Sequence, residues 1–245
     1  MTQPMCWICG DPADTGEHMI KKTDLAEIFG KPKQGKPLFL HNAAKTNHII
    51  QGLNAEALKL ASRLCAKCNN ERSQPYDRAW EAFSRFVRNR HPPVVPGTFI
   101  RADRIYALDS NRELRNVQLY FVKLFGCLIH ENGIPIDLKP FAKAFLERKF
   151  HRDVFIRLGC MQRTDRIVGV AGLSTAVDNH TGKVSCAQWF YELDRFAVNV
   201  IYAEDHDFWD VTDGAWHPKF GTGRLLVHDF SGNIRVDDQQ QNSGG

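Results

Sequence analysis

The chain has 245 residues, of which 43% are hydrophobic and 24% are charged. This composition is that of an ordinary globular protein, and it excludes a disordered tail, a collagen-like repeat and a disulfide-dense miniprotein. No stretch approaches the roughly 20 apolar residues that a membrane span needs. Residues 1–5 lack the basic start and the apolar run of a signal peptide. We therefore expect a soluble, cytoplasmic protein without a membrane partner.

Positive charge is concentrated in the first two-fifths of the chain. Residues 1–95 hold 14 Lys and Arg against 9 Asp and Glu, whereas the remaining 150 residues hold 18 against 19. The net charges are therefore +5 and −1, which agrees with the total of +4. A total of +4 is small for a nucleic-acid-binding protein. The imbalance is compatible with a polyanionic partner of the N-terminal part or with a solvated surface.

The predicted elements of the N-terminal part lie around two cysteine pairs. They are a helix over 21–30, two strands over 36–41 and 47–50, a helix over 54–64 and an amphipathic helix that begins near Pro75. Three prolines and a glycine within residues 92–97 forbid a helix there and predict a domain boundary. We therefore expect one domain over residues 1–91.

Beyond the boundary, the pattern changes to long apolar segments. Helices are predicted over 112–130 and 139–150. Strands are predicted over 154–158, 167–173, 184–192 and 196–203, with a last hairpin that joins 225–230 to 233–236. This order predicts a helix-then-sheet α+β domain over 98–236 and a disordered tail over 237–245. The fold class is therefore α+β in two parts.

Four of the seven cysteines form two close pairs, Cys6-x2-Cys9 and Cys65-x2-Cys68. An odd number of cysteines without a signal peptide argues against a disulfide framework. Two intervening residues allow a tight turn to aim both thiolates at one metal, so the two pairs predict a four-thiolate structural Zn²⁺ site. Four unrelated thiols and a redox C-x-x-C pair are the alternatives, although two pairs fit the redox motif poorly.

Two further motifs stand at fixed places relative to these pairs. Glu17-His18 comes eight residues after Cys9, and Asn69 directly follows Cys68. This order resembles the HNH endonuclease family with its ββα-metal fold, in the subgroup braced by a four-cysteine zinc. In that family an acidic-His dipeptide ends the first strand of a hairpin, and an Asn or His follows the last cysteine. The resemblance covers residues 6–90, about a third of the chain.

The resemblance implies a metal-dependent endonuclease that hydrolyses DNA phosphodiester bonds, with RNA not excluded. His18 would be the general base, because a neutral imidazole accepts a proton near pH 7. Glu17 and Asn69 would hold a catalytic Mg²⁺ or Mn²⁺ through their oxygens. Adjacent strand residues point to opposite faces, so Glu17 and His18 can face one ion only where a bulge or the strand end re-aims one of them.

Several other residues are candidates for the same site. Four basic residues are expected to bind nucleic acid: Lys21, Lys22, Arg72 and Arg78. Three residues are alternative ligands, although an exposed loop is the favoured interpretation of the two histidines among them: Asn70, His41 and His48.

One departure from the family pattern weakens the catalytic hypothesis. The family has an Asn about five residues before the third cysteine, where this chain has Leu60, and Asn47 and Asn54 are out of register. The departure leaves open a second hypothesis, a zinc-braced nucleic-acid-binding protein without catalysis. No chemistry is predicted for residues 98–236, whose role would be substrate recognition or partner docking, and the acidic cluster at 205–210 is interpreted as a solvated loop or a second metal site.

Overall fold

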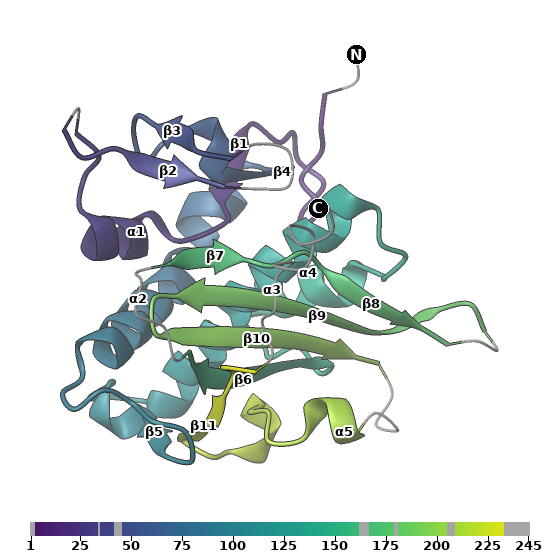
Figure 1. Ribbon diagram of the computed structural model, residues 1–245. Coiled ribbons are helices and arrows are strands. Elements are labelled where there is room, and N and C mark those ends of the chain that lie inside the picture. The colour runs from purple at the N-terminus through teal and green to yellow at the C-terminus, as the bar shows by residue number, and fades with distance from the viewer. Residues whose placement is uncertain are drawn as a thin grey trace, which may run out of the picture.

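The computed structural model describes residues 3–33, 35–41, 46–161, 167–178, 181–204 and 209–232. In these ranges the protein is mixed α+β, with two small two-stranded sheets and one seven-stranded sheet (Figure 1). The predicted tail over 237–245, the strand over 233–236 and the acidic residues at 205–207 lie outside the described residues. No helix within the described ranges has both the length and the apolar composition to cross a bilayer.

The N-terminal part is built around an antiparallel strand pair. β1 (Thr15–His18) pairs with β4 (Lys59–Leu64). The insert between them contains α1 (Lys22–Phe29), β2 (Leu38–Leu40), β3 (His48–Ile50) and the short 3-10 helix η1 (Glu56–Leu58). After β4 come the π-helix η2 (Lys67–Arg72) and the helix α2 (Gln74–Asn89).

The predicted helix over 54–64 is wrong, because most of this segment is the strand β4. Leu58, Ala61 and Leu64 have the three-residue spacing of a helix face, and this spacing produced the error. The structure follows a different period. Leu60, Ser62 and Leu64 are buried, whereas Ala61 and Arg63 between them are not, as expected of a strand with one face against the core. The predicted helices at 21–30 and from Pro75, and both short strands of the insert, are confirmed.

The second part contains a long buried helix and the large sheet. Its helical elements are η3 (Ala102–Arg104), α3 (Ser110–Asn132), α4 (Lys139–Glu147), α5 (Trp209–Thr212) and η4 (Pro218–Phe220). Its strands are β5 (Phe99–Arg101), β6 (Val154–Cys160), β7 (Val168–Val170), β8 (Ser174–Val177), β9 (Val184–Leu193), β10 (Phe196–Ala203) and β11 (Arg224–Asp229).

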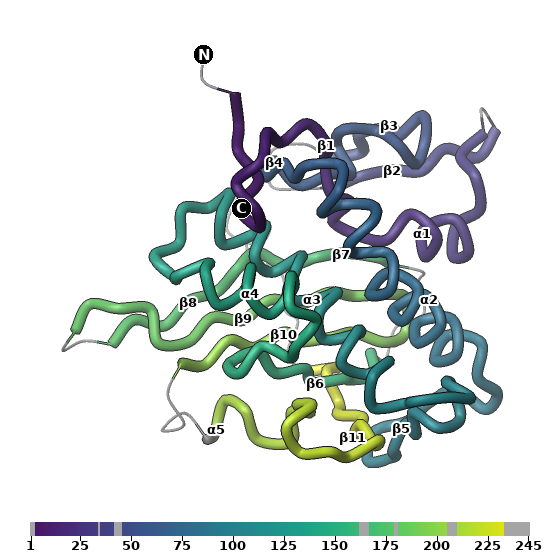
Figure 2. Tube along the Cα trace, turned by 180° about the vertical axis from the view of Figure 1, so that it is seen from behind, coloured from purple at the N-terminus to yellow at the C-terminus, as the bar shows by residue number. Residues whose placement is uncertain are grey.

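The strands of the large sheet follow the order β5-β11-β6-β10-β9-β7, and β8 also pairs with β9. β11 lies between β5 and β6 and runs parallel to β6. α2, α3 and α4 lie on one face of this sheet, as the view from behind shows (Figure 2). The β1–β4 pair and the insert lie beyond the β7 edge in both views.

One continuous apolar core joins the two parts of the chain. Trp80 of α2 stacks on Tyr120 of α3 at a centroid distance of 5.4 Å and meets Tyr191 of β9 edge-on at 5.5 Å. Trp7, next to Cys6, lies so close to α3 that a Cβ atom on Gly126 would come within 2.4 Å of its ring. The boundary predicted at residues 92–97 therefore separates segments that share buried surface.

Candidate functional site

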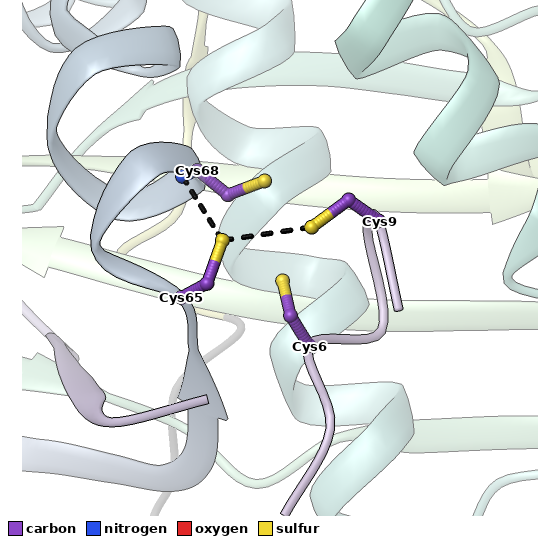
Figure 3. A group of neighbouring side chains, drawn as sticks. All are labelled: Cys6, Cys9, Cys65 and Cys68. Carbon is purple, nitrogen blue, oxygen red and sulfur yellow. Dashed lines mark hydrogen bonds between the residues drawn. The ribbon is translucent and has the colours of Figure 1, made fainter. Parts of the chain in front are cut away.

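The four paired cysteines converge on one point. Cys6 and Cys9 come from the N-terminal turn, whereas Cys65 and Cys68 come from the end of β4 and the start of η2 (Figure 3). Their four sulfur atoms all lie within 4.8 Å of one another. A tetrahedral zinc with Zn–S bonds of about 2.3 Å requires sulfurs about 3.8 Å apart. This cluster can therefore hold a metal such as zinc.

Local backbone geometry aims these sulfurs. Gly10 has φ +78°, and its N–H donates to the Cys6 carbonyl at 2.8 Å, which closes the first turn. Glycine is favoured there because a side chain strains this backbone conformation. In the second turn the Asn69 N–H donates to the Cys65 carbonyl at 3.0 Å, and the Cys68 N–H lies 3.4 Å from the Cys65 sulfur. Both C-x2-C pairs are thus formed by tight turns.

Burial of the cluster makes ionisation of its thiols depend on nearby positive charge. Burial raises the pKa of the Cys9 thiol to about 11 and raises the pKa of Cys68 further above its ordinary value. Burial also opposes ionisation of Cys65, but hydrogen bonds from the Cys68 backbone and the neighbouring thiols lower its pKa overall. Arg72 donates to the Cys68 sulfur at 3.2 Å. A metal would supply the remaining positive charge that ionised thiolates need.

Glu17 and His18 lie at the end of β1, where the pairing with β4 is irregular. Gly16 pairs with Arg63, but His18 pairs with Lys59, so the register shifts between Gly16 and His18. Adjacent strand residues normally point to opposite faces, and a register shift of this kind can re-aim one of them. The side chains nevertheless make separate contacts: Glu17 is buried against α3, and His18 contacts the insert.

His18 is held in one tautomer. Its Nε2 lies 2.9 Å from the Leu53 carbonyl oxygen, which can only accept a hydrogen bond, so Nε2 carries the proton. Nδ1 of the neutral ring is therefore the basic nitrogen. Burial lowers the pKa of His18, and so do three nearby lysines, Lys59, Lys22 and Lys21. The hydrogen bond to the Leu53 carbonyl raises the pKa but does not outweigh them. The ring is thus neutral at pH 7 and has the protonation state of a general base.

Glu17 takes part in a buried ionic network. Its carboxylate lies 3.1 Å from the ammonium of Lys123 on α3, and Lys123 lies 3.4 Å from Asp77 of α2. Lys123 is 1% exposed. Burial opposes its charge, but Glu17 and Asp77 outweigh that effect and raise its pKa above the ordinary value. Lys123 therefore lies between two carboxylates, and Asp77 has Lys21 as a second partner at 3.2 Å.

Asn69 connects η2 to the strand that carries Glu17 and His18. Its Nδ2 donates to Thr15 Oγ1 at 3.1 Å and points to the Gly16 carbonyl at 3.4 Å. Its Oδ1 is buried and has no hydrogen-bond partner among the described residues. A buried amide oxygen without a partner is costly, and it is one of the oxygen donors that Mg²⁺ or Mn²⁺ accepts.

The four basic residues expected to bind nucleic acid differ in availability. Arg72 contacts a cysteine sulfur, and Lys21 forms ion pairs with Asp77 at 3.2 Å and Glu81 at 3.6 Å. Lys22 is exposed and donates to Asn54 at 2.7 Å, and Arg78 is exposed on α2. Lys22 and Arg78 are thus the more accessible two.

The three alternative ligands lie at the surface. Asn70 is exposed on η2, beside the half-buried Asn69. His41 is exposed, and its Nδ1 accepts a hydrogen bond from the Asn47 N–H at 3.3 Å. His48 is exposed on β3. Among the described residues, only the four cysteines form a cluster of three or more His, Cys, Asp or Glu ligand atoms close enough for a metal ion.

Sequence reasoning missed the groups that hold Glu17 and His18. The carbonyl that fixes His18 belongs to Leu53, next to Asn54, whereas Leu60 is a core residue of β4. The helix wrongly predicted over 54–64 began directly after Leu53, so this loop was not expected there. Lys123 did carry a signal, because a lysine within the apolar run of α3 needs a buried anionic partner.

No family model, curated protein or solved structure matches this chain. The roles of these residues therefore rest on their geometry and chemistry. The strongest features are the four-cysteine cluster, the fixed tautomer of His18 and the unpartnered Asn69 oxygen.

Proposed function

We propose that the protein is a metal-dependent endonuclease of the HNH type, acting on DNA phosphodiester bonds. The observation that carries the proposal is the tautomer of His18, whose Nε2 is bonded to the Leu53 carbonyl and whose Nδ1 is the free base. The half-buried position of this ring and its lowered pKa keep it neutral at pH 7. Its place between two halves of a four-cysteine motif suits the zinc-braced subgroup of that family.

In the proposed reaction His18 Nδ1 accepts a proton from the attacking water, and this proton transfer is worth about 10²–10⁴-fold in rate. Asn69 Oδ1 fits a hard divalent cation because it is a buried oxygen that lacks a partner among the described residues. Glu17 fits as a second ligand only when its carboxylate exchanges Lys123 for the ion. Such an ion, Mg²⁺ or Mn²⁺, would neutralise charge that develops on the phosphate. The cysteine cluster would hold zinc as a structural metal.

The test is nicking of supercoiled plasmid by the full chain in Mg²⁺, in Mn²⁺ and in excess EDTA. The wild-type protein should nick only with a divalent cation, and His18→Ala should lose at least 10²-fold in rate. His48→Ala is the matched control, because His48 is an exposed histidine in the same part of the chain. Equal rates for His18→Ala and the wild type would remove His18 as the base.

A specific contact favours a second function, a zinc-braced nucleic-acid-binding protein without catalysis. The Glu17–Lys123 pair supplies a resident positive charge where the first proposal needs an exchangeable ion. Metal content distinguishes the two. The binding protein should hold one zinc and show no further Mg²⁺-dependent signal in calorimetry, whereas the nuclease should show a second, weaker site for Mg²⁺ or Mn²⁺.

A further inference from the structure

Residues 31–33, 35–41 and 46–50, named here the β2–β3 arm, have no acidic side chain. They contain three Lys, two His and no Asp or Glu. Lys31, Lys33 and Lys36 are exposed, and no carboxylate in the described part of the chain forms an ion pair with them. The two acidic residues of the adjacent helix α1 already have arginine partners. Asp24 forms an ion pair with Arg88, and Glu27 forms ion pairs with Arg85 and Arg88. The positive charge of these three lysines is therefore not paired with a carboxylate within the described residues.

The two strands of the arm alternate in burial. Leu38 pairs with Ile50, which is 1% exposed and belongs to the core. Phe39 pairs with Ile49 on the opposite face, where they are 47% and 55% exposed. A solvent-facing position of a two-stranded ribbon normally carries a polar side chain. Here an aromatic and a β-branched side chain lie directly across from each other and present one apolar contact surface.

The arm lies at the same end of the molecule as the His18 site. β2 and β3 lie beside β1 and β4 at one corner, away from the centre of the large sheet, in both views (Figures 1 and 2). β3 ends at Ile50, and Leu53, three residues later, accepts the His18 hydrogen bond. Three residues span at most about 11 Å, so the end of β3 lies near the residue that holds His18.

We propose that the β2–β3 arm is the surface that binds double-stranded DNA. Its lysines contact phosphates, and the Phe39–Ile49 pair contacts base edges or sugars inside a groove. A two-stranded β-ribbon fits the major groove, which is about 12 Å wide, and apolar side chains make favourable contacts with thymine methyl groups or base steps. The charge complementarity is direct, because an arm without acids meets a polyanion. The inference deepens the proposed function, since it takes nucleic acid as the ligand of the His18 module, but binding does not require cleavage.

The experiment measures binding of a fluorescent 30-base-pair duplex to the full, zinc-loaded chain without added Mg²⁺ or Mn²⁺, at several salt concentrations. Lys33→Gln/Lys36→Gln removes two charges from the arm, and Phe39→Ser/Ile49→Ser removes the apolar pair. Lys139→Gln/Lys143→Gln on α4 and Leu108→Ser/Leu146→Ser are the matched controls, since these residues are also exposed. The zinc content and the thermal transition of each variant verify its fold.

The two arm variants should weaken binding in different ways. Loss of Lys33 and Lys36 should make the slope of log K against log[salt] less steep by about 2, because each phosphate contact contributes about 0.9. Loss of Phe39 and Ile49 should weaken binding about tenfold with the slope unchanged, since apolar groove contacts involve no counterions. Both control variants should bind like the wild type.

Several results would overturn the inference. They are wild-type duplex affinity in both folded arm variants, an equal loss in the α4 control, or binding of the arm to anionic phospholipid vesicles in preference to the duplex. The outcomes also separate the inference from the proposed function. Arm-dependent binding without nicking in any metal would sustain the arm and refute the nuclease. Nicking that requires His18 but not the arm would do the opposite.

Discussion

The ammonium nitrogen of Lys123 lies 3.1 Å from the Glu17 carboxylate, and both side chains are buried. The contact joins α3 to the residue directly before His18, across 106 positions of sequence. A buried ion pair of this kind fixes geometry more than it adds net stability, because desolvation offsets most of the attraction. The position of β1 thus depends on a helix from the other part of the chain.

Lys123→Met should destabilise the protein by about 3–5 kcal/mol, because it leaves the Glu17 carboxylate buried without its counter-charge. Glu17→Gln/Lys123→Met should recover most of that loss, since neither partner is then charged. Urea unfolding at pH 7 measures both values. Mg²⁺ should raise the midpoint of Lys123→Met more than that of the wild type, because the freed carboxylate can bind the ion. Lys139→Met, at an exposed position of α4, serves as control.

Two outcomes of the Lys123→Met experiment would contradict this prediction. A Lys123→Met protein as stable as the wild type would show that the pair is not a structural constraint. A destabilised protein that gains nothing from Mg²⁺ would argue against a cation site at Glu17 and for the binding protein without catalysis.

The proposed function predicts a pH dependence of cleavage from the environment of His18. Burial lowers the pKa of His18 below the ordinary value of 6.5, and the neutral ring would be the active form of the proposed base. The rate should therefore be constant above pH 6.5 and should fall about tenfold per pH unit below the lowered pKa. Measurement of kcat/KM from pH 5 to 8 checks this. A rate that keeps rising tenfold per unit above pH 7 would point to a different base, and His41→Ala should leave the profile unchanged.

A second histidine makes the fold itself sensitive to acid. His151 is 2% exposed, its Nδ1 accepts from the Asp153 N–H at 3.1 Å, and burial lowers its pKa to about 4. The unfolded chain binds this proton near pH 6.5, so stability is present above pH 6.5 and is lost as the pH falls towards 4. Between pH 6.5 and 5 the loss should be about 2 kcal/mol.

Urea unfolding of the wild type, His151→Gln and His41→Gln at pH 7 and pH 5 measures this effect. The loss should shrink in His151→Gln and should be retained in His41→Gln, whose histidine is exposed. Equal losses in all three proteins would assign the acid sensitivity to other groups.

Sequence alone predicted the parts of the site that depend on local spacing. The two C-x2-C pairs predicted the sulfur cluster, because each pair needs only one tight turn. The alternation rule predicted that Glu17 and His18 can face one ion only at an irregular strand; the register shift lies there, but the two side chains make separate contacts. Relationships between distant segments were not predictable in this way. Counting charges did not show that Arg72 binds a sulfur or that Lys21 binds Asp77 and Glu81.

The cysteine cluster should determine whether the N-terminal part folds. Cys65→Ser should reduce the zinc content from about one per chain to none and should lower the thermal transition, because zinc-binding energy is folding energy in such units. Cys186→Ser is the matched control, since Cys186 is buried in β9 outside the cluster. Mass spectrometry under native conditions and calorimetry measure the two effects. Stable, metal-free wild-type protein would contradict the zinc assignment.

Trp7 ties the N-terminal turn to a helix that lies far away in the sequence. The ring packs against Gly126 of α3, and its Nε1 lies 3.4 Å from the Cys127 sulfur, so the first cysteine turn rests on a helix some 120 residues away. A segment can be exchanged between proteins only if its buried side chains find all their partners within that segment. Without the first 97 residues, Lys123 would lose both of its carboxylate partners, and the space at Gly126 that the Trp7 ring fills would be empty. Division of the chain at the proline-rich segment would therefore leave buried groups without their partners in both parts.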